Sequence, residues 1–379
     1  MKNHRISRRD FIRGSSTAGV LLAGGAAGIG ALGAGEADEI AAQASPPQPA
    51  GAAAVPGISG QGSMKFKVLY TSSHLPEAAQ RVLVHAHGGF AVDRRPGHGE
   101  TYFFLPGAGI LRIDADLKAI HLLNTPAPMK KVNLHDTTIW YSPEDGNPYL
   151  VFPANDAGKI FTTTLDGKLV CTLDAPNSGS HFEQPEVHDY FLGGGNFAPT
   201  GVAYLDGIYY ITTGYSNLDF VLTARVSDPS KVAWNDLAFG GKGDGRSQFQ
   251  TAHAISVHPG TSQLDITDRP HSEVKRFSRY GHYLSTLKMP MGSLPCSIDH
   301  LDDYALIPTL VGPDPGKGAP IYIFQNERLI SAVFPKSELG LKNFEHNHKA
   351  VFRKIGDKFY IVVQAWNPGD FAILEQLTS

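Results

Sequence analysis

The sequence predicts an all-β protein, a six-bladed β-propeller, and three observations support this fold. Long amphipathic helical patterns are scarce. Short runs rich in β-branched and aromatic residues alternate with Gly, Pro, Asp and Asn, as in 208–213, 263–267 and 358–363. A unit of short strands separated by polar turns also recurs along the chain, and such repeats close into toroidal folds. A pair of β-sandwiches is the alternative architecture.

The N-terminal region predicts an export signal. A twin arginine, Arg8-Arg9, precedes an uncharged Gly/Ala-rich stretch over 15–35, and small residues at 41–44 suit a cleavage site. We therefore expect residues 1–45 to be a twin-arginine signal peptide, recognised by the twin-arginine export machinery. The mature protein is then periplasmic or secreted, with no stable membrane span after cleavage. A membrane anchor is the alternative, but Gly and Ala make the stretch weakly hydrophobic.

Residues 46–64 are mostly Pro, Ala, Gly and Ser, a composition typical of a disordered linker. The remaining residues, 65–379, form the predicted propeller, a length that closed all-β folds often reach as one domain. The formal net charge is −3, so nucleic acid is not expected as a partner. The two cysteines, Cys171 and Cys296, lie far apart in the repeat scheme, so no disulfide framework is expected.

Six copies of the repeat can be placed along the chain. The clearest copy runs from His253 to Leu284 and contains the strand patterns 253–257, 263–267 and 273–277. Because the innermost strand of each blade lines the channel of a propeller, the residue that begins each copy can reach the axis. The six copies begin near His87, His135, Thr200, His253, Cys296 and His348.

Histidines begin every second copy, and these predict a metal site on the axis. His135, His253 and His348 share one position in blades two, four and six. Three imidazoles that meet there leave a coordination position open, as catalytic zinc sites do. Neutral imidazole suits zinc (Zn²⁺), copper (Cu²⁺), iron (Fe²⁺) and nickel, so the ligand type alone leaves the metal open, with zinc as the expected metal and iron or copper as alternatives. His87 is a possible additional ligand, or a hydrogen-bond donor beside the metal.

The chain resembles the catalytic core of peptidylamidoglycolate lyase, a six-bladed propeller family related to NHL repeats, over roughly residues 80–379. The resemblance rests on His-Phe-Glu-Gln-Pro at 181–185, Gly-Tyr-Ser-Asn at 214–217, and the segment 253–277 with its Asp-Arg pair. It implies a zinc ion held by three histidines from alternate blades. It also implies a catalytic tyrosine at Tyr215 and an active-site arginine at Arg269.

The chain departs from this family at three places. No arginine stands in blade one where the family carries a second essential one, and the sequence there reads Tyr-Phe-Phe-Leu-Pro-Gly-Ala at 102–108. Lys349 stands where the family has an aspartate that binds structural calcium, which leaves structural Ca²⁺ open. Ser216 replaces a family cysteine. The scaffold and metal site therefore look retained, whereas the substrate end looks rebuilt.

The chemistry of these residues predicts an exported metal-dependent enzyme, lyase-like or hydrolytic, that acts on a small-molecule or peptide-like substrate. Beside a metal and Arg269, we expect the hydroxyl of Tyr215 to ionise more readily and act as a general base. The planar guanidinium of Arg269 suits a carboxylate or an oxyanion. The structural alternatives are a channel-wall role for Tyr215 and a salt bridge from Arg269 to Asp268 or Glu273.

Two other function classes fit the same fold. One is a non-catalytic NHL-type propeller that binds a protein or glycan. The other is a different propeller enzyme: a metal-dependent hydrolase such as a calcium lactonase, or an iron oxygenase with His87 as fourth ligand. A calcium lactonase would need Glu, Asn and Asp around the axis rather than histidine.

Overall fold

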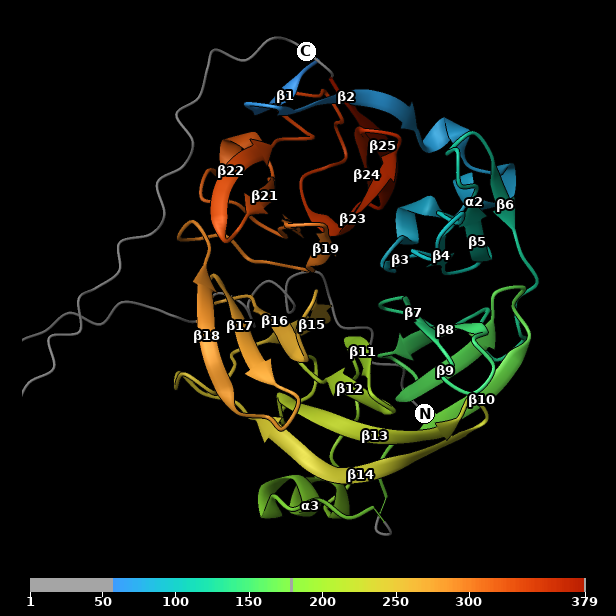
Figure 1. The fold of residues 1–379 in the computed structure, drawn as a ribbon, viewed down its shortest axis with the longest axis vertical. Coiled ribbons are helices and arrows are strands. Elements are labelled where there is room, and N and C mark those ends of the chain that lie inside the picture. Colours follow the sequence, from blue (N-terminus) through green and yellow to red (C-terminus); the bar gives the residue numbers. More distant parts are fainter. Residues whose placement is uncertain (1–56, 178–179, 378–379) are drawn as a thin grey trace, which may run out of the picture. The chain divides into compact units, whose positions relative to one another are not determined.

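The computed structural model describes residues 57–177 and 180–377. Within them, six antiparallel sheets surround a central axis, and Figure 1 looks down that axis. The predicted six-bladed β-propeller is thus confirmed. The predicted signal peptide, residues 1–45, lies outside the described residues.

The first five blades each contain four strands, ordered from the axis to the rim as they follow in the chain. Blade 1 comprises β3 (Phe90–Val92), β4 (Thr101–Leu105), β5 (Gly109–Ile113) and β6 (Ile120–Leu122). Blade 2 comprises β7 (Thr138–Tyr141), β8 (Pro148–Ala154), β9 (Lys159–Thr164) and β10 (Leu169–Asp174). Blade 3 comprises β11 (Gly201–Leu205), β12 (Ile208–Thr212), β13 (Phe220–Asp228) and β14 (Lys231–Gly240). Blade 4 comprises β15 (Ala252–His258), β16 (Gln263–Asp268), β17 (Glu273–Ser278) and β18 (Tyr283–Lys288). Blade 5 comprises β19 (Asp299–Leu301), β20 (Tyr304–Pro308), β21 (Ile321–Gln325) and β22 (Arg328–Val333).

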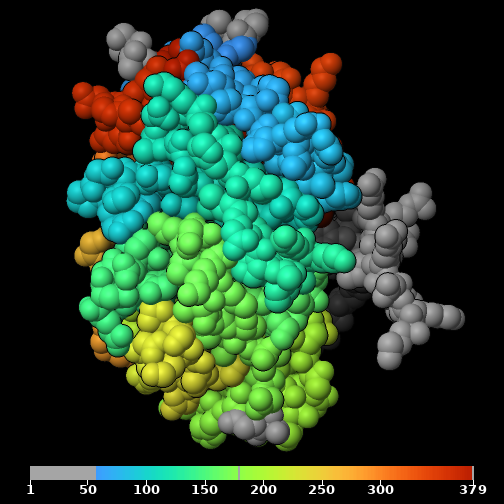
Figure 2. All heavy atoms as spheres, turned by 90° about the vertical axis from the view of Figure 1, so that its right-hand side faces the viewer, coloured from blue at the N-terminus to red at the C-terminus, as the bar shows by residue number. Residues whose placement is uncertain are grey.

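Blade 6 joins the two ends of the described chain in one sheet. Its inner strands are C-terminal and its outer strands N-terminal, so β2 pairs antiparallel with β25. Figure 2 shows the blue N-terminal segment packed beside the red C-terminal one. This pairing closes the ring without leaving an open joint. The strands, from axis to rim, are β23 (Asn347–Ile355), β24 (Lys358–Ala365), β25 (Asp370–Gln376), β2 (Met64–Thr71) and β1 (Ser59–Gln61).

Strand β1 corrects the predicted boundary of the disordered linker, because it lies inside 46–64. Its residues are fixed by blade 5: the amide of Phe334 donates to the hydroxyl of Ser59 at 2.7 Å, and the amide of Gln61 donates to the hydroxyl of Ser331 at 2.9 Å. Met64, the last residue of the predicted linker, is 1% exposed and joins the core between blades 5 and 6. Composition alone misses this segment because its order comes from partners more than 260 residues away.

Apolar side chains fill each of the six joints between neighbouring blades. Phe104 and Phe152 pack edge to face between blades 1 and 2, and Phe249 packs on Phe277 between blades 3 and 4. A blade is therefore covered on both faces, so a strand such as β4 is buried at every residue. This explains why several strands read as continuous apolar runs rather than alternating ones.

The helical segments are short and lie in connections. The longest, α3, begins with Pro185 at its first turn, where proline costs no hydrogen bond. Within the described ranges, no helix is long and apolar enough to cross a bilayer. Cys171 and Cys296 are both free, as expected. The segments are η1 (Ser72–His74), α2 (Glu77–Gln80), η2 (Leu83–His85), α3 (Pro185–Leu192) and η3 (Pro315–Lys317).

The predicted starts of the six repeats coincide with the entry into the six innermost strands. His253 and His348 are the second residues of β15 and β23. His135 lies just before β7 and is held by a bond from its amide to the carbonyl of Pro153 at 2.8 Å. The repeats placed on the sequence therefore begin where the blades of the structure begin.

Candidate metal centre

Three predicted histidines from alternate blades meet on the axis. The ring centroids of His135 and His253 are 4.7 Å apart, those of His135 and His348 are 4.7 Å apart, and those of His253 and His348 are 5.3 Å apart. All three residues are at most 2% exposed. The structure therefore brings together the three residues that the sequence selects.

Each of these imidazoles is oriented by a carbonyl of the next blade. Nδ1 of His135 lies 2.7 Å from the oxygen of Thr200, and Nδ1 of His253 lies 2.5 Å from the oxygen of Cys296. Nδ1 of His348 lies 3.0 Å from the oxygen of Gly88. A carbonyl only accepts, so each Nδ1 must carry the proton. In the neutral ring this leaves a lone pair on Nε2, the arrangement typical of histidine ligands.

The Nε2 atoms of His135 and His348 face each other at 3.2 Å. Since both nitrogens carry lone pairs, this approach is unfavourable unless a cation lies between them. Two nitrogens bound to one tetrahedral zinc at about 2.0–2.1 Å would lie about 3.3 Å apart. The observed separation therefore fits a shared metal ion.

A proton is a poor substitute for that cation. Burial, followed by the nearby His87, holds the pKa of His135 and of His348 well below the ordinary value. Burial and the charge of Arg269 do the same to the pKa of His253. The three rings are therefore neutral near pH 7, which is the form that binds metal.

His87, the possible fourth residue, lies beside this group but is oriented differently. Its ring centroid lies 4.7 Å from that of His135 and 4.5 Å from that of His348, and the ligand nitrogens of these three lie within 4.8 Å of one another. The amide nitrogen of Asn133 can only donate, and it lies 2.8 Å from Nδ1 of His87. Nδ1 then accepts, and the proton lies on Nε2. In this tautomer His87 is a donor toward a bound molecule rather than a ligand.

The surroundings of His87 differ from those of the three axial histidines. Unlike the three axial histidines, His87 is partly exposed, and its ring stacks on Trp366 with centroids 5.3 Å apart. Burial and Arg269 lower its pKa to about 3, so the ring is neutral. The ring centroid of His346 lies 6.1 Å from that of Trp366, and Nδ1 of His346 contacts the carbonyl of Leu310 at 2.7 Å.

Tyr215 and Arg269 both reach the metal centre, each from the connection between the second and third strands of its blade. The hydroxyl of Tyr215 lies 3.1 Å from Nε2 of His253 and accepts a bond from Nη1 of Arg269 at 3.0 Å. Both residues thus lie beside the axial histidines, and their catalytic roles stay predictions. Burial raises the pKa of the Tyr215 hydroxyl, and the charge of Arg269 offsets part of that rise. The expected easier ionisation of Tyr215 beside a bound metal stays a prediction.

Arg269 is the unusual charge of the site, because it is 5% exposed and forms no ion pair with a carboxylate among the described residues. Its Nη2 donates to the sulfur of Cys296 at 3.1 Å, and its Nε is buried without a hydrogen-bond partner. The alternative salt bridge to Asp268 is not formed, because Asp268 contacts His271 and Lys275 instead. A buried cation without a counter-ion is costly, and a bound anion would reduce that cost.

Lys349 is a residue of the site whose partner sequence reasoning missed. Its ammonium lies 2.8 and 2.9 Å from the two carboxylate oxygens of Asp136, the residue after His135. Burial raises the pKa of Asp136, and Lys349 counteracts that rise. Gly89 allows this contact, because a Cβ there would lie 1.9 Å from an oxygen of Asp136. A fixed positive charge thus stands where the resemblance would place a calcium ligand.

Three further clusters of histidines and carboxylates exist in the described part of the chain, but each holds its own basic residue. Asp265, with His258 and His300, is bonded by Arg276. Arg95 pairs with Asp93 in the second cluster, and Lys275 pairs with Asp268 in the third. These cations satisfy the carboxylates, so the clusters are ion-pair networks rather than metal sites.

No protein-family model matches this chain, and no curated protein matches it. Among solved structures it is similar to a gluconolactonase from Xanthomonas campestris, at 12% identity and a TM-score of 0.52, over 86% of this chain and 99% of that one. It is also similar to selenomethionine-substituted virginiamycin B lyase from Staphylococcus aureus, at 15% identity and a TM-score of 0.47, over 77% and 96% of the two chains. At 12% identity, the likeness to the gluconolactonase concerns the fold alone.

Proposed function

We propose that this protein is an exported metal-dependent enzyme that cleaves a small anionic substrate by elimination or hydrolysis. His135, His253 and His348 bind the metal, and zinc fits them best. The observation that carries the proposal is the set of three Nδ1-to-carbonyl contacts, which leave the Nε2 lone pairs unprotonated on three neutral rings whose centroids lie within 5.3 Å of one another. When bound, such a metal polarises an oxygen of the substrate or lowers the pKa of a water molecule.

Tyr215 moves the proton in this proposal. Its hydroxyl lies at hydrogen-bond distance from both His253 and Arg269, so it can exchange a proton with a substrate bound between them. Because burial raises its pKa, the protonated form is the resting one, and the positive charge of Arg269 favours the phenolate when it forms.

Arg269 binds the anionic part of the substrate. Its buried Nε has no hydrogen-bond partner, and the guanidinium lacks a carboxylate partner in the described structure. A carboxylate or an oxygen that gains negative charge would satisfy both. His87, as a donor from Nε2, faces the same space and can orient a second oxygen.

An iron oxygenase with four histidines is the second candidate, because the nitrogens of His87, His135 and His348 lie within 4.8 Å of one another. It requires the tautomer of His87 opposite to the one that Asn133 favours. A calcium lactonase is less consistent with the site, since four imidazoles stand where carboxylates and amides would bind calcium.

The proposed place of action is the periplasm or the cell exterior. This rests on the twin arginine and the small-residue segment of residues 1–45. Since the twin-arginine route carries folded proteins, the metal can be bound before export. Lysine substitution of Arg8 and Arg9, followed by cell fractionation, tests this: the unprocessed precursor should accumulate inside the cell.

Elemental analysis of the purified protein tests the metal centre. We expect about one equivalent of zinc per chain, and its loss in His253→Ala, because two imidazoles hold zinc poorly. His282→Ala is the matched control, since His282 is exposed and lies in the turn before β18 of the same blade. The proposed site is contradicted if both variants retain zinc. It is also contradicted if the native protein and both variants all lack zinc. Stoichiometric iron lost in His87→Ala favours the oxygenase. With zinc present, α-hydroxyamides and lactones that bear a carboxylate are the substrates to test first.

A further inference from the structure

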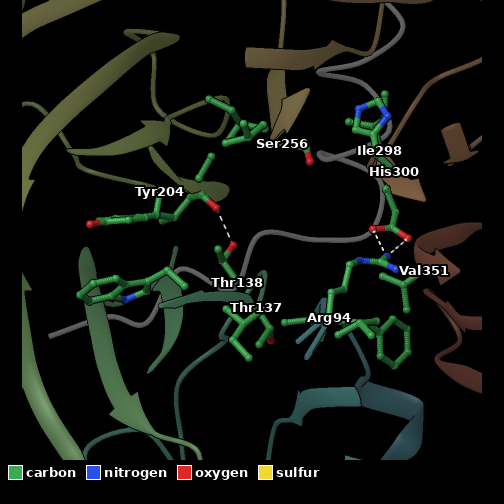
Figure 3. A pocket seen from close by; sticks show the side chains of 18 of the residues that line it. Arg94, Thr137, Thr138, Tyr204, Ser256, Ile298, His300 and Val351 are labelled. Carbon is green, nitrogen blue, oxygen red and sulfur yellow. Dashed lines mark hydrogen bonds and ion pairs between the residues drawn. The ribbon is translucent and has the colours of Figure 1, made fainter. Parts of the chain in front are cut away.

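A second cavity lies at the other end of the same axis. Its volume is about 440 Å³, and it is lined by residues that follow the axial histidines along the innermost strands, from all six blades. Figure 3 shows its walls, with Thr137 and Tyr204 on one side and Ile298 and Val351 on the other. This is within the size range of small-molecule sites.

The cavity is separate from the metal centre. Lys349 is the one residue that lines both this cavity and the small space beneath the three imidazoles. Its ammonium is held against Asp136, so this buried ion pair lies between the two spaces. A molecule in the second cavity therefore does not touch the metal ligands.

The walls suit an apolar, flat molecule. Val202, Ile255 and Ile298 provide aliphatic surface from three neighbouring blades. Trp140 and Tyr204 stack on each other with ring centroids 4.4 Å apart and add aromatic surface. Removing such surface from water favours binding of an apolar body.

One buried hydroxyl in this wall lacks a partner. Thr137 is 2% exposed, and its Oγ1 makes no hydrogen bond among the described residues. The neighbouring Thr138 differs, because its hydroxyl donates to the carbonyl of Val202 (Figure 3). Buried polar atoms normally find partners, so an unpaired one that lines a cavity indicates a ligand.

Arg94 gives the mouth of the cavity a positive donor. It reaches from blade 1 to Asp299 of blade 5, and both contacts, each 2.8 Å, use the same nitrogen, Nη2 (Figure 3). Nε and Nη1 make no hydrogen bond within the described ranges, and the side chain is 33% exposed. Asp299 is already bonded by the amide of Phe352 at 2.7 Å. The unused edge of Arg94 is thus available to a carboxylate.

We propose that this cavity binds a small aromatic monocarboxylate, with the ring between the aliphatic and aromatic walls and the carboxylate on Arg94. Thr137 donates to a polar atom of the same ligand. The site is independent of the metal centre, so its ligand need not be the substrate.

Isothermal titration of the metal-loaded protein with cinnamate and with its neutral amide, cinnamamide, tests this proposal. We expect cinnamate to bind about tenfold more tightly than cinnamamide, because a charged hydrogen bond is lost with the amide. Arg94→Gln should remove that difference, and Thr137→Val should weaken both ligands. Arg112→Gln is the matched control, since Arg112 pairs with Asp114 in blade 1 away from the cavity and should leave both affinities unchanged.

Two filling variants locate the ligand. Ile255→Trp and Val202→Phe, each verified as folded by circular dichroism and thermal unfolding, should abolish binding of cinnamate. His253→Ala should lose metal and still bind cinnamate, which separates failure of this proposal from failure of the metal centre. The proposal is overturned if the native protein binds neither compound at millimolar concentration, if both bind equally, or if a folded filling variant binds as the native protein does.

Discussion

The even and the odd blades contribute different groups to the axis, although every blade is an antiparallel sheet with its innermost strand at the axis. Blades 2, 4 and 6 supply an imidazole, whereas blades 3, 5 and 1 supply the carbonyl oxygen that orients it. The side chains at the odd positions, Thr200 and Cys296, do not take part in this role, because the carbonyl belongs to the backbone. The difference shows how a repeat can diverge in sequence while its backbone keeps a functional contact.

Blade 1 is the exception within the odd set. Its carbonyl comes from Gly88, and the preceding His87 directs an imidazole into the same space. Blade 1 therefore supplies both an imidazole and an orienting carbonyl oxygen, so the six blades do not follow a strict threefold symmetry around the axis. This asymmetry leaves one side of the metal centre lined by His87 and Trp366 rather than by backbone.

The largest expected effect is on zinc content, which should differ between the alanine variants of His348 and His87. His348→Ala should reduce bound zinc from about one equivalent to nearly none, whereas His87→Ala should keep the metal, because the proton of His87 lies on Nε2. Metal analysis of both variants after dialysis measures this. Equal loss in both would make His87 a ligand and remove the distinction between the blades.

Tyr215→Phe breaks the contact between blade 3 and the histidine of blade 4. The variant should retain its metal and lose about 10²- to 10⁴-fold in kcat on the substrate found, the range expected for loss of a proton-transfer group. Steady-state kinetics beside metal analysis gives the answer. A variant that loses metal and activity together would give Tyr215 a structural role.

Phe66→Ala tests the pairing of β2 in blade 6, which closes the ring and belongs to the same sheet as His348. Phe66 is fully buried between blades 5 and 6, so its truncation should cost about 3–5 kcal/mol in the free energy of unfolding. Chemical denaturation measures this cost. The exposed Leu284→Ala in blade 4 is the control and should change stability little. A similar cost at both positions would contradict a special role for the closing strand.

The joint between blades 4 and 5 carries a charge network that should make stability depend on pH. Burial acts to raise the pKa of Asp265, but contacts from His258 and Arg276 outweigh it and hold that pKa well below the usual value. Because the pKa of Asp265 is lower in the folded than in the unfolded chain, the ionised carboxylate stabilises the fold at pH values above the unfolded pKa of 3.8. This stabilisation is lost progressively as the pH falls below 3.8.

Asp265→Asn should therefore cost about 3 kcal/mol at neutral pH, and the difference from the native protein should shrink below about pH 4. Denaturation curves at several pH values check the sign. A difference that grows with acid would mean that Asp265 is not held ionised by its neighbours.

Sequence reasoning reached the fold and the meeting of three histidines on the axis because both depend on a repeat. The phase of His135, His253 and His348 is visible in one dimension, and so is the Asp-Arg pair that places Arg269. Features that arise from ring closure were missed. The pairing of Lys349 with Asp136 joins blades 6 and 2, and β1 depends on residues of blade 5.

The second cavity was missed for the same physical reason. Its lining takes a few residues from every blade, none of which differs in the sequence from ordinary strand residues. The burial that raises the pKa of Tyr215 was also missed, because the charge of Arg269 is visible in the sequence whereas burial of the hydroxyl is not.

Blade 6 takes strands from both ends of the described chain, and this has a consequence for the order of events during maturation. His348 lies in β23, and that strand belongs to the sheet that β2 completes from the opposite end of the described chain. His348 therefore takes its position when the circle of blades is complete, so uptake of the proposed metal would be a late step. A bound ion would then act as a seal on the finished ring, joining blades 2, 4 and 6 across the centre and making reopening at that joint slower than in the metal-free protein.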